Sequence, residues 1–138
     1  MILYIDSSAI LRSLLGQPDA VEAHESYSNV ITSTLSEVEC LRSVDRLRLR
    51  EKMDERRSSA LREGVFRLLE EVEAVEITRA VLRQASLPMS TSLGSLDAIH
   101  FATAFLWRES TAEEVILATH DDALAAAARA NGFAVVGA

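Results

Sequence analysis

The chain has 138 residues, a length that suits one domain with one hydrophobic core. Hydrophobic residues make up 49% of it and charged residues 25%, and no apolar run approaches the length of a membrane span. The N-terminus lacks the basic start of a signal peptide, and the single cysteine, Cys40, excludes an internal disulfide framework. We therefore expect one globular domain over residues 1–138, located in the cytoplasm.

The formal net charge of −7 is unusual for a protein that binds nucleic acid, but the basic residues are concentrated in one segment. Eight of the fourteen lie between Arg42 and Arg62. They either form a solvated helix face, paired with acids such as Asp45 and Glu51, or a surface that faces RNA. The charge pattern leaves both interpretations open.

The first stretch of the chain predicts a buried strand that ends at a carboxylate. Residues 2–5 are all apolar or aromatic, Asp6 follows them, and Ser8 then opens a helix. This helix is predicted over residues 8–15, and a second one over residues 19–28. In an open α/β sheet, ligands bind beyond the carboxyl ends of the strands, so Asp6 lies where a functional acid is expected.

The rest of the chain alternates between short apolar strands and amphipathic helices. Further strands are predicted at residues 30–31, 74–77, 115–118 and 134–136. Further helices are predicted at residues 35–49, 51–72, 79–86, 96–106 and 122–130, with Thr78 as the cap of the third. Thr32, Ser33 and Thr34 offer a helix cap, with Glu37 available as the capping-box partner of Thr34, and Ser95 is a second predicted cap. This order predicts an α/β fold with a mostly parallel sheet of four or five strands, from which the two long helices project as a hairpin.

Four acids can reach the carboxyl edge of such a sheet when its strands are threaded with right-handed crossovers. Asp6 follows the first strand, and Asp121 follows the fourth after two residues. Glu39 lies just inside the helix after the second strand, and Asp97 lies in the first turn of the helix after residues 87–94. Clustered carboxylates repel one another unless a cation joins them, and Mg²⁺ or Mn²⁺ prefers oxygen ligands. Two such ions, about 4 Å apart, activate water for phosphodiester cleavage without a nucleophilic side chain.

Each of these acids also has a structural interpretation. Asp97, Asp121 and Asp122 all lie at predicted helix starts, where a carboxylate stabilises the helix without any other role. Glu37 is better explained as a cap partner, whereas Glu39 lies away from the helix start and beside the apolar stripe. From the residues alone, Glu37 remains an alternative to Glu39, and Asp122 remains an alternative to Asp121.

Four motifs occur in a characteristic order between Met1 and Val136: YIDSSAIL, TSTLSEVECLRS, SLDAIHFATA and ATHDDALAAAARANGF. In this order they resemble the PIN-domain family, and in particular the VapC-type toxins of bacterial toxin–antitoxin pairs. The resemblance implies a three-layer PIN-like fold and a metal-dependent endoribonuclease that uses Mg²⁺ or Mn²⁺. The family's catalytic, metal-binding acids fall on Asp6, Glu39, Asp97 and Asp121. Ser8 supports the first acid in this comparison and Thr119 supports the last, and the family spacing disfavours Glu37 and Asp122.

The resemblance also implies partners. Proteins of the VapC type cleave RNA, and a small VapB-like antitoxin inhibits them by placing its tail over the acidic site. They commonly form homodimers or toxin–antitoxin hetero-oligomers. The hairpin at residues 42–72 and the apolar helices near the N-terminus are the expected docking surfaces.

Two rival functions remain to be weighed. A non-catalytic PIN-like interaction domain would keep the fold without the activity, although the full set of acids argues against it. A receiver-like phosphoacceptor domain would need paired acids near the start of the chain and a late lysine, yet no lysine follows Lys52.

The histidines and aromatic residues offer no second chemistry. Cys40 and the histidines lack zinc-site spacing. We interpret His100 as a residue that packs or caps locally within its helix and His24 as a surface residue, whereas His120 is a candidate for substrate contact. Trp107 and its neighbouring phenylalanines are assigned to the core.

Overall fold

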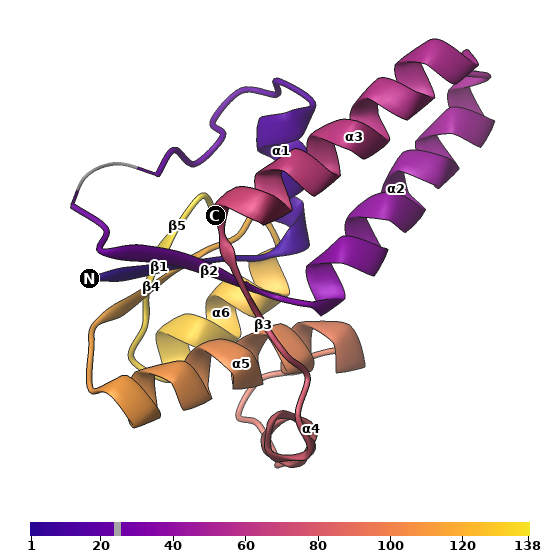
Figure 1. Ribbon diagram of the computed structural model, residues 1–138. Coiled ribbons are helices and arrows are strands. Elements are labelled where there is room, and N and C mark those ends of the chain that lie inside the picture. The colour runs from indigo at the N-terminus through magenta and orange to yellow at the C-terminus, as the bar shows by residue number, and fades with distance from the viewer. Residues whose placement is uncertain (24–25) are drawn as a thin grey trace.

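A five-stranded parallel sheet lies between two layers of helices in the computed structural model, which describes residues 1–23 and 26–138 (Figure 1). The strands are β1 (Ile2–Ile5), β2 (Asn29–Ser33), β3 (Glu73–Val75), β4 (Val115–Ala118) and β5 (Ala134–Val136). The helices are α1 (Ser7–Leu14), α2 (Leu35–Glu51), α3 (Glu55–Glu71), α4 (Arg79–Ala85), α5 (Ser95–Thr111) and α6 (Asp122–Ala130). The predicted α/β class and parallel sheet are thereby confirmed.

Side chains that alternate along the strands divide the core between the two faces of the sheet. Tyr4 of β1 and Leu117 of β4 belong to a buried cluster with Phe101 of α5 and Leu124 of α6. Leu3 and its neighbours on the opposite face pack against α1. A further cluster joins α1 to the hairpin of α2 and α3, which projects beyond the sheet as expected (Figure 1). The result is the predicted three-layer arrangement.

The strand order places β1 at the centre of the sheet. The order is β3-β2-β1-β4-β5, so the chain winds away from β1 in one direction through β2 and in the other through β4. Ile5, the last residue of β1, is paired with Ala118, the last residue of β4. The carboxyl ends of these two strands therefore flank the point where the winding reverses, which is the usual position of ligand sites in open α/β sheets.

The helix predicted over residues 19–28 is wrong. The described residues of this segment, 19–23 and 26–28, form turns and irregular backbone, and Asp19 has a left-handed φ of 61° that interrupts a right-handed helix. Val21 and Tyr27 instead pack onto the sheet beside Leu3. His24 lies outside the described residues.

The cap predicted for α2 is confirmed in position, but not the capping bond of Thr34. Thr34 is the N-cap residue of α2 and its side chain makes no capping bond, whereas the Ser33 hydroxyl, another of the three candidates, accepts the Leu35 N–H at 3.1 Å. The predicted cap of α5 is wrong, because Gly94 is the N-cap and Ser95 is the first helical residue. In the part of the chain that the structure describes, no helix combines the length and apolar character needed to cross a membrane.

Candidate active site

Asp6 connects the end of β1 to the start of α1. Its side chain is the N-cap of α1, where Oδ1 accepts the Ala9 N–H at 2.9 Å and the Ser8 hydroxyl at 2.7 Å. The Thr119 hydroxyl, which follows β4, donates to Oδ2 at 2.5 Å. Asp6 is 2% exposed, so these three donors replace the water that the buried carboxylate has lost.

Ser8 and Thr119 join the ends of β1 and β4 into one hydrogen-bonded unit. The Ser8 oxygen accepts the His120 N–H at 2.9 Å, and the Thr119 oxygen accepts the Asp121 N–H at 3.0 Å. The two hydroxyl oxygens are 3.3 Å apart. Thr119 therefore contacts both the first and the last acid of the predicted set, whereas Ser8 contacts the first.

Asp97 and Asp121 lie at the starts of two helices on the same side of the sheet. Asp121 is the N-cap of α6, and its Oδ1 accepts the Leu124 N–H at 2.8 Å. Burial raises the pKa of Asp97 to about 6, repulsion from Asp121 contributes next, and His100 opposes the rise. Asp6 and Glu39 raise this pKa as well. The charges of the other three predicted acids therefore all act on Asp97 at the carboxyl edge of the sheet.

Glu39 reaches this edge from α2 and is held by a buried histidine. His100 Nε2 lies 2.5 Å from Glu39 Oε1, and His100 Nδ1 lies 2.7 Å from the Tyr4 hydroxyl. His100 is 1% exposed and the Glu39 side chain is 20% exposed. Burial raises the pKa of Tyr4 well above its usual value, so this phenol stays protonated.

The interpretation of His100 as a local packing or capping residue is therefore wrong. Its partners are 61 and 96 residues away in the sequence, and it links β1 to α2. The available signal was its position one turn after Asp97, which places both side chains on one face of α5. That spacing does not identify Tyr4 or Glu39 as partners.

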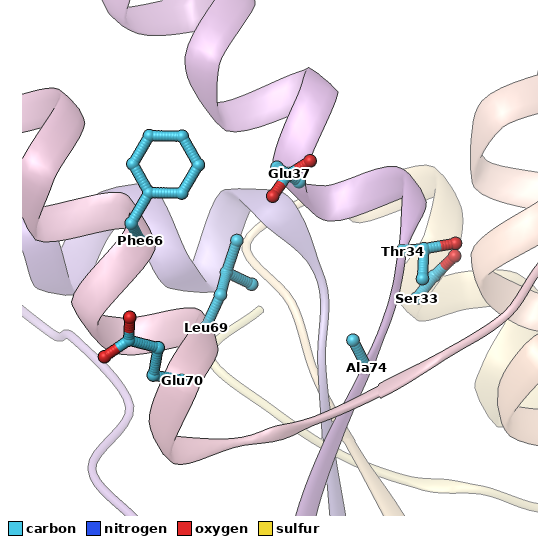
Figure 2. Close-up of a pocket in the computed structure, with 7 residues that line it drawn as sticks. All are labelled: Ser33, Thr34, Glu37, Phe66, Leu69, Glu70 and Ala74. Carbon is cyan, nitrogen blue, oxygen red and sulfur yellow. The ribbon is translucent and has the colours of Figure 1, made fainter.

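The two alternative acids lie apart from this cluster. Glu37 is exposed and lines a separate pocket of about 280 Å³, together with Phe66 and Leu69 of α3 (Figure 2). Asp122 is exposed in the first turn of α6. Neither acid is among the charges that shift the pKa of Asp97.

The basic segment is partly a solvated helix face. Asp45 pairs with Arg42 at 3.1 Å and with Arg48 at 2.9 Å, and Arg50 lies 3.9 Å from Glu51. Arg42 thus pairs with Asp45 one turn further along α2.

The donor set fits a hard divalent cation by its chemistry. Among residues 1–23 and 26–138, no three His, Cys, Asp or Glu side chains are arranged as a ready-made metal site. Asp6 accepts hydrogen bonds on both carboxylate oxygens, whereas in the bonds described above Asp121 uses only Oδ1 and Glu39 only Oε1. Carboxylate oxygens suit Mg²⁺ or Mn²⁺. Burial raises the pKa of Cys40 to about 12, which excludes this thiol as a ready ligand.

Comparisons with known proteins agree with this architecture. The model of the PIN domain family matches residues 3–130. A toxin–antitoxin complex from Klebsiella pneumoniae has a similar structure, with a TM-score of 0.62 and 17% identity over 86% of each chain. So has VapBC2 from Rickettsia felis, bound to a fragment of its promoter DNA, with a TM-score of 0.61 and 14% identity over 98% of this chain and 97% of that one.

VapC20 from Mycobacterium tuberculosis, a toxin that cleaves the sarcin–ricin loop, is a third similar structure. Its TM-score is 0.55 at 18% identity, over 99% of this chain and 98% of the VapC20 chain. At these identities the three likenesses show the fold. A comparison with curated proteins found no match.

Proposed function

The chain belongs to the PIN-domain family, and on this basis we propose that it is a metal-dependent endoribonuclease, the toxin of a toxin–antitoxin pair. The observation that carries the proposal is that Thr119 bonds the Asp6 carboxylate and the Asp121 N–H at the ends of β1 and β4, while Asp97, whose pKa is raised by burial and by the other three acids, lies at the same edge. The likeness to two toxin–antitoxin assemblies and to the toxin VapC20 supports the toxin assignment, and the cleavage of the sarcin–ricin loop by VapC20 supports RNA as the substrate.

In this proposal, Asp6, Glu39, Asp97 and Asp121 hold Mg²⁺ or Mn²⁺ directly or through water. When bound, the cation lowers the pKa of a water nucleophile and stabilises the leaving oxygen of the phosphodiester. Ser8 and Thr119 fix Asp6, because their hydroxyls donate to both of its oxygens. Asp97 carries a proton more readily than an ordinary aspartate, and it gives up that proton when positive charge enters the cluster.

We further propose a VapB-like antitoxin as the inhibitory partner, since two of the similar structures are toxin–antitoxin assemblies. A homodimer or a toxin–antitoxin hetero-oligomer, located in the cytoplasm with its RNA substrate, completes the proposal. The alternative is a PIN-like interaction domain without activity. It predicts that the acids do not bind a metal ion.

The test is RNA cleavage by the purified protein with Mg²⁺ or Mn²⁺, with mapping of the new 5′ ends. Asp6→Asn and Asp97→Asn are expected to lower the cleavage rate at least a hundredfold. Asp122→Asn and Glu37→Gln are matched controls, because these acids are exposed neighbours of the proposed ligands, and both should cleave like the wild type. Wild-type rates in the Asp6 and Asp97 variants, with folding verified by circular dichroism, would show that the site is wrongly assigned.

A further inference from the structure

A pocket of about 330 Å³ lies between α2 and the starts of α1 and α5. It shares Glu39 with the candidate active site. Two other lining residues, Ser7 and Leu96, are the chain neighbours of Asp6 and Asp97. Whatever occupies this pocket therefore lies beside Glu39, one of the four acids of the proposed function.

The walls of the pocket near the acids are apolar and open to solvent. Val38 and Leu96 both line it, and each is 51% exposed. Exposed apolar side chains beside a candidate site are typical of surfaces that a ligand covers. A flat group with little charge, such as a nucleobase, gains contact with both side chains when it enters between them.

The far end of the pocket is basic. Arg42 and Arg46 line it one and two turns after Glu39, on the same face of α2. Arg42 is 60% exposed and already pairs with Asp45. Arg46 donates to the Ser43 hydroxyl at 2.9 Å, and in the part of the chain that the structure describes no carboxylate is ion-paired with it. A guanidinium without an acid partner binds phosphate well, because its planar N–H groups match the phosphate oxygens.

We propose that this pocket is the subsite for the RNA nucleotide next to the scissile phosphate. The base lies between Val38 and Leu96, and the following phosphate binds Arg46, with Arg42 beside it. Arg46 is seven positions after Glu39, which corresponds to about 10 Å along α2. Glu39 and Arg46 thus lie at opposite ends of a pocket sized for one nucleotide. This inference rests on the proposed function and names the substrate-binding part of that site.

Charge favours RNA over a protein segment as the occupant. An apolar peptide would also fill the space between Val38 and Leu96, but it would leave the Arg46 guanidinium without an anion. In RNA, each base is followed along the strand by a phosphate at a fixed spacing. The pocket offers apolar walls for the base first and arginines for the phosphate beyond them.

The experiment measures Kd for a labelled single-stranded RNA oligonucleotide without divalent cations, and then KM, kcat and the mapped cleavage sites with them. Arg46→Ala is expected to raise Kd and KM about tenfold while kcat changes less than twofold. Val38→Ala with Leu96→Ala should weaken the base preference beside the cut. Arg62→Ala and Leu49→Ala are matched controls, because both residues are exposed and neither lines the pocket, and they should behave like the wild type.

Unchanged Kd, KM and cleavage sites in the Arg46 and the Val38/Leu96 variants would overturn the subsite. The same holds if these variants weaken binding to the purified antitoxin instead, since the pocket would then be a protein-docking groove. Failure of the proposed function is distinguishable, because it gives no cleavage by the wild-type protein. RNA binding that depends on Arg46 would in that case support nucleotide binding in the pocket without cleavage.

Discussion

Replacing His100 by leucine tests the contact that fixes Glu39. An ionised carboxylate only accepts hydrogen bonds, so His100 donates from Nε2 to Glu39, and its Nδ1 is hydrogen-bonded to the Tyr4 hydroxyl. Leucine has a similar volume but neither nitrogen. His100→Leu therefore removes two hydrogen bonds from the centre of the protein without leaving a large cavity.

The expected loss of stability follows from the surroundings of the two partners. A hydrogen bond to an ionised group contributes about 1.5–3 kcal/mol, and the Glu39 side chain, 20% exposed, recovers part of this from water. Tyr4 is 0% exposed, and the loss of one partner of its hydroxyl costs about 1 kcal/mol, since Thr103 also interacts with it. The total is about 2–3 kcal/mol. With an unfolding entropy of about 0.29 kcal/mol/K for a chain of this length, Tm falls by roughly 7–10 °C.

Urea denaturation of the wild type, His100→Leu, Tyr4→Phe and the double variant measures this effect. The double variant should lose less stability than the sum of the two single variants, by about 1 kcal/mol, because it leaves no unpaired hydroxyl. Phe101→Leu is the control for activity, because Phe101 is buried one residue away and packs toward other partners. At a temperature where both are folded, RNA cleavage should fall at least tenfold in His100→Leu and little in Phe101→Leu.

A loss of less than 0.5 kcal/mol in His100→Leu, with additive effects in the double variant, would refute this reasoning. So would equal cleavage by His100→Leu and Phe101→Leu.

Three further predictions concern the acids and their support. The pKa of Asp97 rises from 3.8 to about 6 on folding, chiefly through burial. In the absence of metal, the protonated Asp97 side chain therefore stabilises the fold fully below pH 4, and this stabilisation is lost as the pH rises through 6. Asp97→Asn should therefore be about 1–2 kcal/mol more stable than the wild type at pH 7 in a chelator, after allowance for its partial exposure, and equal urea midpoints at pH 7 would contradict this. Mn²⁺ should bind the wild type in calorimetry and bind Asp6→Asn at least tenfold more weakly; equal affinities would remove Asp6 from the ligand set. Gly137→Ala should cost about 2 kcal/mol in thermal denaturation, because φ is +96° and the new Cβ would lie 2.7 Å from the Thr119 carbonyl oxygen; an unchanged Tm would contradict this.

Local chemistry explains why the strands and the acids could be predicted. Residues 2–5 form a wholly apolar run that can only be buried, and a carboxylate directly after such a run must lie at the strand end. The same argument placed Asp121 after β4 and Asp97 at the start of α5, because helix starts favour acids. These positions depend on a few consecutive residues, so they can be predicted without knowledge of the rest of the chain.

The wrong predictions concern segments in which other contacts outweigh the preference of the local sequence pattern. The composition of residues 19–28 is compatible with a helix, yet Val21 and Tyr27 are taken up by the sheet surface. Thr34 and Glu37 have capping-box spacing, but the neighbouring Ser33 hydroxyl bonds the backbone instead, and Glu37 turns toward α3. Local preferences are worth about 1 kcal/mol, which packing against a sheet readily exceeds.

The sequence by itself determined the alternation of strands and helices, and with it the edge at which four acids can meet. Tertiary structure alone decided which distant side chains bond to Asp6 and Glu39. His100 meets Tyr4 and Glu39 across 96 and 61 residues, and Thr119 meets Asp6 across 113, because parallel strands bring distant segments to one edge of the sheet. A hydrogen bond between such segments depends on the packing of the whole chain, so no pattern of neighbouring residues predicts it.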